Sequence, residues 1–238
     1  MAENPGAHPW ACAGSTTVLE ALRKRTRSLH ARIGANPAMA RLFQKDFTLP
    51  EYKAHLIKLL GLFEPLEALV SMIESPLDDP ARGLGRVNEL RTDLEMIGIS
   101  KGEIEAAKRC FQLPQIPPSG VLGYTYVVLG SRQGGRIIVN RLRPILGPAA
   151  SFRFYGEGDF TDETVWQSFC LALEQTYEQD LDAICDTACA TFDAYDAWLS
   201  AKHTPATLVR NSRAMLQPFY GSIIAPVDVR YNNDGFVK

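Results

Sequence analysis

Two groups of residues have types and spacing suited to chemistry: a histidine in a basic segment, and a set of glycines about a hundred residues further on. They are His30 and Gly123, Gly130, Gly134 and Gly135. An imidazole nitrogen binds iron, and neighbouring cations pair with carboxylates. A helix face without side chains lets another backbone or a flat ligand approach closely. Taken singly, the histidine is typical of a packed core residue and the glycines of a helix-packing face. Together they indicate a site for a planar, anionic metal complex.

His30 belongs to a segment whose apolar residues predict a helix that starts at Ser15, Thr16 or Thr17 and ends at Gly34. Steps of three and four residues place one stripe toward the core: Leu19, Leu22, Thr26, Leu29 and Ile33. The opposite side is basic, with Arg23, Lys24, Arg25, Arg27 and Arg32. Because His30 lies at the edge of the apolar stripe, we expect a half-buried imidazole.

The glycines lie in the stretch 123–142, which reads GYTYVVLGSRQGGRIIVNRL. Its apolar run predicts a buried helix that ends near Arg143 and Pro144, although residues 137–139 would favour a strand by propensity alone. Each glycine in a helix interior costs about 1 kcal/mol relative to alanine, so something should offset that cost. Gly123, Gly130 and Gly134 are seven and four residues apart and fall on one helix face. Either a packed helix or a flat ligand would use such a face.

Elsewhere the apolar patterns predict helices at about 37–45, 48–74, 84–97, 101–110, 161–179 and 181–201. No stretch alternates with period two for long enough to require a sheet, so we predict an all-α fold, a single-domain helical bundle. We expect a flexible N-terminal segment over residues 1–14, the helical domain over 15–202 and an irregular C-terminal tail over 203–238.

The overall charge argues against two classes of partner. A net charge of −2 and a pI near 6.1 do not favour binding to nucleic acid or to a membrane surface. The five scattered cysteines form no CxxC pair and indicate buried thiols in a reducing compartment. The first residues lack a basic start and an apolar core, and no run has the length of a membrane span. We therefore expect a cytoplasmic protein.

Three stretches resemble the heme oxygenase family, particularly the bacterial type that accompanies bacteriophytochromes. They are LRKRTRSLH at 22–30, NPAMARLFQKDFTLPEYKAHLIKLLGLFEPLE at 36–67, and GSRQGG at 130–135. The resemblance covers about residues 16–200 and implies a helical fold that holds heme, iron protoporphyrin IX, between a proximal and a glycine-rich distal helix. Heme would then be both cofactor and substrate, cleaved with O2 to biliverdin, CO and ferrous iron. Electrons would come from a ferredoxin or a reductase, and a bacteriophytochrome is a candidate bilin acceptor.

The resemblance also assigns roles to residues. It makes His30, in a Leu-x-x-x-Thr-x-x-x-His motif with Thr26, the proximal iron ligand. It places Gly130, Ser131, Gly134 and Gly135 over the ring, where side chains at Gly130 or Gly134 would occupy the oxygen site. We assign the heme propionates to Arg23 or Arg27, with Arg132, Arg136 or Arg141 as alternatives.

The chain departs from the family pattern at three places. Ser131 replaces the aspartate that follows the first distal glycine in mammalian relatives, and Gly34 replaces a glutamate four residues after the histidine. Eleven acidic residues and no Lys or Arg occur from Phe154 to Ala201. Two alternatives therefore stay open: a heme or bilin carrier without turnover, and the thiaminase-like branch with a cysteine nucleophile. We expect His55 and His203 at the surface.

Overall fold

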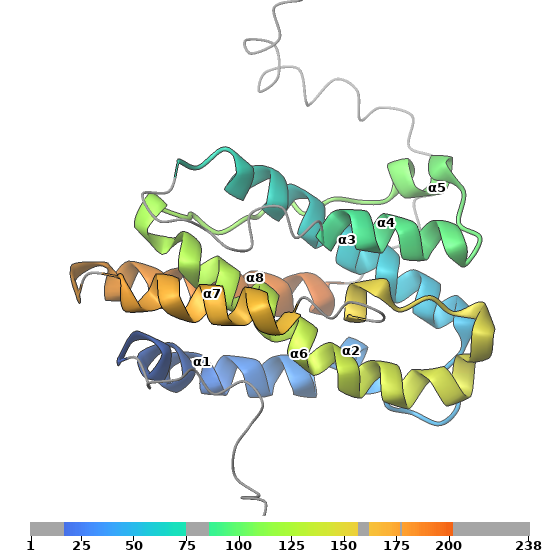
Figure 1. Ribbon diagram of the computed structural model, residues 1–238. Coiled ribbons are helices and arrows are strands. Elements are labelled where there is room, and N and C mark those ends of the chain that lie inside the picture. Colours follow the sequence, from blue (N-terminus) through green and yellow to red (C-terminus); the bar gives the residue numbers. More distant parts are fainter. Residues whose placement is uncertain (1–16, 75–85, 157–161, 177, 202–238) are drawn as a thin grey trace, which may run out of the picture. The chain divides into compact units, whose positions relative to one another are not determined.

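The computed structural model describes residues 17–74, 86–156, 162–176 and 178–201, and these ranges contain helices and connections but no strand (Figure 1). The α-helices are α1 (Thr17–Ala35), α2 (Pro37–Arg41), α3 (Leu49–Ser71), α4 (Arg86–Met96), α5 (Lys101–Ala106), α6 (Val121–Leu146), α7 (Asp162–Glu174) and α8 (Leu181–Ser200). Short 3-10 turns are η1 (Pro118–Gly120), η2 (Gly147–Ala149), η3 (Arg153–Tyr155) and η4 (Glu178–Asp180). The all-α prediction is confirmed.

Local sequence signals explain where several helices begin and end. Thr48 and Glu51 form a capping box at the start of α3, in which the Thr48 backbone N–H donates to Glu51 Oε2 at 2.9 Å. Ser100 and Glu103 repeat this arrangement at α5. Between α4 and α5, Gly98 adopts φ +83°, a left-handed conformation that glycine tolerates.

Helix α8 supports both helices that carry the predicted site. α1 and α6 each pack along α8 rather than along each other, and α7 also lies against α6 (Figure 1). The contact face of α8 has the three- and four-residue spacing of a helix stripe: Ile184, Cys185, Ala188, Phe192 and Tyr195 are all buried. The relative placement of α1 and α6 therefore depends on α8.

A buried carboxylate fixes the segment that follows α6. Asp93 of α4 is fully buried and accepts hydrogen bonds from Ser151 Oγ at 2.5 Å and from the backbone N–H groups of Arg153 and Phe154 at 2.9 Å. Burial raises the pKa of Asp93, although these hydrogen bonds oppose the shift. The bonds hold η3 against α4, and η3 also packs against α6.

Several boundaries differ from the sequence expectation. α2 ends at Arg41 rather than near Lys45, α7 ends at Glu174 rather than near Gln179, and α6 continues past Pro144 to Leu146. The residues with strand propensity at 137–139 are helical, because the surrounding long helix overrides a three-residue preference.

Other sequence predictions concern the cysteines and the chain ends. Cys110, Cys185 and Cys189 are free thiols, as predicted, but Cys170 is disulfide-bonded. The segments expected at 1–14 and 203–238 lie outside the described residues. Within the described part of the chain, no helix combines the length and the apolar character needed to span a bilayer.

Candidate functional site

The glycines of α6 have two different environments. A Cβ added at Gly123 would collide with the Ile184 carbonyl of α8, and one at Gly135 would lie 2.5 Å from the Tyr155 carbonyl of η3. A Cβ at Gly130 or Gly134 would meet no described residue within 4 Å. The first pair therefore permits close packing, whereas the second pair leaves an open surface on the helix.

A hydrogen bond near this open surface links α6 to α1. Thr26 is 2% exposed, and its hydroxyl donates to Leu22 O at 2.7 Å and lies 3.4 Å from the Tyr126 hydroxyl of α6. His30 follows Thr26 by one helical turn, and Gly130 follows Tyr126 by one turn. Both helices run in the same sense in Figure 1, so His30 and Gly130 each follow a residue of the bridge by one turn in the same chain direction.

The His30 side chain is exposed, not half-buried as its place beside the apolar stripe predicted. Its ring presents an edge-to-face contact to Phe192 of α8, with centroids 6.1 Å apart and an interplanar angle of 83°. The described residues contain no cluster of three His, Cys, Asp or Glu side chains that could hold a metal ion by themselves. An accessible single imidazole is instead suited to the axial position of a metal complex with its own equatorial ligands.

The arginines of α1 divide into two sets. Arg25 pairs with Asp182 at 2.6 Å and Asp186 at 3.3 Å, and Arg32 pairs with Asp193 and, at 2.9 Å, with Asp196. The hydrogen bond to Asp182 raises the pKa of Arg25. The acidic surface of α8 is thus partly neutralised by α1, which the sequence analysis did not anticipate.

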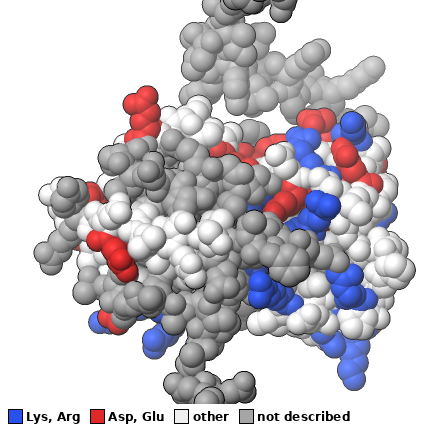
Figure 2. Space-filling model, viewed as in Figure 1, with Lys and Arg blue, Asp and Glu red and all other residues white. Residues whose placement is uncertain are grey.

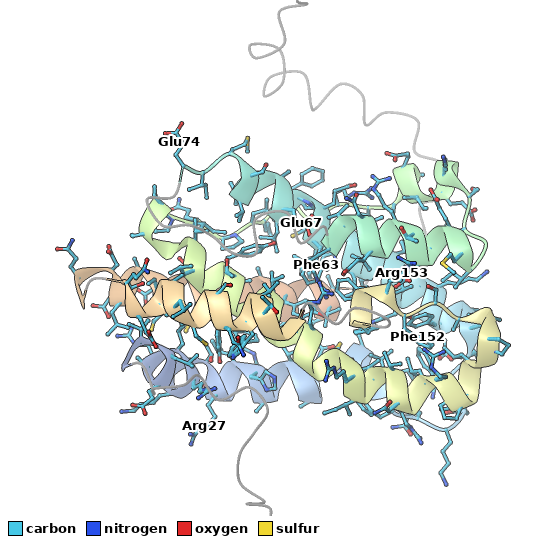
Figure 3. The ribbon with its side chains drawn as sticks, viewed as in Figure 1. Arg27, Phe63, Glu67, Glu74, Phe152 and Arg153 are labelled. Atoms are coloured by element: carbon cyan, nitrogen blue, oxygen red, sulfur yellow. The ribbon has the colours of Figure 1, made fainter. Side chains whose placement is uncertain are left out.

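Arg23 and Arg27 form the second set. Both are exposed, and neither is in an ion pair with another described residue. With His30 they follow the spacing of one helix face, and Arg27 projects outward from α1 (Figure 3). These two guanidinium groups are available to an anionic ligand.

The arginines of α6 have distinct positions. Arg132 is 2% exposed, and its Nη1 lies 3.2 Å from Glu89 Oε1 of α4. Arg136 is exposed, while Arg141 donates to the Phe43 carbonyl at 2.8 Å from Nη2. Basic side chains gather over the C-terminal half of α6 on the face in Figure 2. Of the α6 arginines proposed for a ligand, Arg132 is therefore inside the protein and Arg136 at its surface.

Ser131 is half-buried and contacts a residue that the sequence analysis missed. Its hydroxyl donates to Val128 O at 2.7 Å, and Arg86 Nη2 of α4 donates to Ser131 Oγ at 3.4 Å. Arg86 is 1% exposed and its guanidinium lies over the Phe154 ring, 4.0 Å from the centroid. No local pattern in the sequence identifies Arg86, because it is brought to Ser131 only by the packing of α4.

The surface position expected for His55 is wrong. His55 is 7% exposed, and its Nε2 lies 2.5 Å from the Tyr155 hydroxyl. Burial lowers the pKa of His55 to about 4, with a smaller contribution from the charge of Lys58. Its partner belongs to η3, whose backbone packs on Gly135, so His55 supports α6 from the packed side. His203 lies outside the described residues.

Comparisons with known proteins agree with one family. A sequence model of the family described as heme oxygenase matches residues 16–201. No curated protein and no solved structure matches the chain. The matched stretch contains His30 and the whole of α6.

Proposed function

The chain belongs to the heme oxygenase family, and from this premise we propose that it cleaves heme oxidatively to biliverdin, CO and ferrous iron, using O2 and external electrons. One observation carries the proposal beyond the family match. Gly130 and Gly134 lower helix stability, yet in the part of the chain that the structure describes nothing lies within 4 Å of where their side chains would be. Close contact with a flat ligand is a physical reason for glycine at both positions.

The residues present fit heme in three respects. His30 offers an exposed imidazole, no described residue lies within 4 Å of the side-chain positions of Gly130 and Gly134, and Arg23 and Arg27 offer exposed cations. When bound, heme would supply the iron that activates O2 and would itself be the molecule oxidised. His30 would ligate the iron, and the glycine surface would face the other side of the ring.

The propionates are assigned here to Arg23 and Arg27. They share a helix face with His30, and their charges are not already neutralised by the acidic residues of α8 as those of Arg25 and Arg32 are. Arg132 is left out of this assignment because it is buried beside Glu89. Arg136 remains a second cation that would reach a propionate if the ring were rotated in its plane.

Two partners follow from the reaction and from the motif resemblance. The reaction needs electrons, which a ferredoxin or a reductase would supply. The resemblance of the segments 22–30 and 130–135 to the bacteriophytochrome-associated type makes a bacteriophytochrome the proposed bilin acceptor.

A heme or bilin carrier on the same fold is the second candidate. It is favoured by Ser131, which is not an acid, and by Gly34, which leaves no carboxylate four residues after His30. In a carrier, heme would bind to His30 but would not be consumed.

Hemin titration followed by turnover separates the two candidates. Wild-type protein should develop a Soret band, and ascorbate or a ferredoxin system with O2 should then convert its spectrum to that of biliverdin. His30→Ala should lose the ligand field, whereas Ser28→Ala on the same helix should not. A stable heme complex that resists reductant and O2 would support the carrier, and the absence of a Soret band would refute both.

A further inference from the structure

A buried charged group lies between α4 and α6, next to the open surface. Arg86 is 1% exposed and Arg132 2% exposed. Both contact Glu89: Arg86 Nη1 lies 2.9 Å from Oε2, and Arg132 Nη1 lies 3.2 Å from Oε1. Glu67 of α3, labelled in Figure 3, completes the group and accepts a hydrogen bond from the Val87 backbone at 3.0 Å. Buried charges are costly to a fold, so a reason other than stability is expected for this group. The positioning of a neighbouring residue is one such reason, and the contacts of the group show which residue that is.

Arg86 extends from this group to the Ser131 hydroxyl. Ser131 donates its only proton to Val128 O at 2.7 Å and accepts from Arg86 Nη2 at 3.4 Å. A serine oxygen has two lone pairs, so one remains. Ser131 directly follows Gly130 and is only half-buried, so part of this residue is open to solvent beside the glycine surface. Because its proton is already donated to Val128 O, the hydroxyl can only accept from a further partner.

We propose that Arg86 is a positioning residue that fixes the Ser131 hydroxyl as the acceptor for one water molecule. This water would donate one of its protons to Ser131 and direct the other toward the space beside Gly130 and Gly134. The inference rests on the proposed heme oxygenase function, because only then does this space receive reacting atoms. The water would supply the donor that an aspartate supplies in relatives that have one after the first distal glycine.

The charges around Arg86 are compatible with a positional role. Glu67 of α3, Glu89 of α4, Arg132 of α6 and Tyr195 of α8 all act on it electrostatically. Burial lowers the pKa of Arg86 and the two glutamates oppose that shift. A guanidinium does not lose its proton in a protein, so Arg86 holds the hydroxyl and does not itself deliver a proton.

Three variants of the full-length hemin complex test this arrangement. Ser131→Ala removes the acceptor. Arg86→Lys keeps the charge but cannot reach Glu89 and Ser131 together, because it lacks the forked guanidinium. The double variant measures whether the two residues act through one another. Arg91→Lys is the matched control, since Arg91 is also an α4 arginine but pairs with Glu64 and Glu105.

The readouts are biliverdin turnover, hemin affinity and the midpoint pH of the acid–alkaline change in the absorbance of the hemin complex. Each single variant should lower turnover about fivefold, the effect of one hydrogen bond, with hemin affinity unchanged. Each single variant should also raise the midpoint pH, by the shift that corresponds to a fivefold change in the acid–alkaline equilibrium. The reason is that the water that stabilises the alkaline form is lost. The double variant should be no worse than either single variant, and Arg91→Lys should match wild type.

The outcomes separate this inference from the proposed function. Additive losses in the double variant, or a wild-type midpoint in Arg86→Lys, would overturn the role of Arg86 while leaving heme binding intact. If Arg86→Lys does not fold, Glu89→Gln takes its place, because it loosens the hold on the Arg86 guanidinium. Glu89→Gln must then raise the midpoint pH, and an unchanged midpoint overturns the proposal. Failure of wild-type protein to bind hemin would instead overturn the function and this inference with it.

Discussion

The two glycine pairs of α6 show that one residue type serves two opposite purposes within a single helix. Gly123 and Gly135 are glycines because backbone carbonyls of Ile184 and Tyr155 occupy the side-chain positions. Gly130 and Gly134 are glycines although their side-chain positions are open. The packed pair is explained by the folded chain alone. The open pair lowers helix stability without a compensating contact in the described protein, which is expected of a binding surface.

The comparison also shows why position along a helix matters as much as the face. Gly123, Gly130 and Gly134 share one face by spacing, but Gly123 lies where α8 crosses the helix. Two turns later the same face is open. Substitutions at the two pairs should therefore have different signatures, one in stability and the other in activity.

The largest expected effect is at the open pair. Gly134→Leu should reduce turnover at least about a hundredfold, because its side chain would enter the space proposed for the ring and its oxygen site. Biliverdin formation measures turnover, and circular dichroism should show unchanged helix content. Gly102→Leu is the matched control, since Gly102 is also helical and has nothing within 4 Å of its side-chain position. Normal turnover in Gly134→Leu would show that the open surface is not the site.

At the packed pair the effect should be on stability. Gly123→Ala should lower the free energy of unfolding by about 3 kcal/mol, because the added methyl meets the α8 backbone, which cannot move aside easily. Gly134→Ala should instead raise it by about 1 kcal/mol through helix propensity. Urea denaturation of the two variants compares these values. If both substitutions shift stability in the same direction, the distinction between the pairs fails.

The packed side of α6 should also be sensitive to acid. The pKa of buried His55 is lowered to about 4, below the value of about 6.5 expected in the unfolded chain. As pH falls from 7 to 5, the unfolded state binds a proton that the folded state excludes, so about 2 kcal/mol of stability should be lost. His55→Gln should remove this part of the pH dependence. The measurement is the difference between the unfolding free energies of the two proteins across that pH range, and a constant difference would contradict the assignment.

The smallest effect concerns the exposed cations of α1 that share a helix face with His30. Arg27→Ala should weaken hemin binding about fivefold, the effect of one lost charge pair at an exposed position. Arg25→Ala, on the same helix, should leave hemin affinity unchanged because Arg25 already pairs with Asp182 and Asp186. Soret titration measures both. Equal losses in the two variants would indicate a general charge effect and not a propionate contact.

The elements that depend on local signals could be predicted from the sequence. The start of α3 follows from Thr48 and Glu51, and the break after α4 from Gly98. The basic and apolar sides of α1 follow from its periodicity. The family was identified from the combination of the motif ending at His30 with the glycine stretch, and the family match confirms that identification.

Features that depend on distant contacts could not be predicted. His55 was expected at the surface, but Tyr155, a hundred residues away, provides its buried partner. Spacing cannot separate Gly123 from Gly130, because the crossing point of α8 is a tertiary feature. Arg86 and Tyr126 carry no motif, and only the side-chain contacts of the folded chain show that they adjoin Ser131 and Thr26.

The proposed function requires heme to lie between His30 and the open glycine surface. The most direct measurement is an experimental structure of the hemin complex. We predict iron bound to a ring nitrogen of His30, with the backbone at Gly130 and Gly134 facing the opposite side of the ring. Iron bound to another residue, with His30 in solvent or with the ring away from α6, would contradict the account.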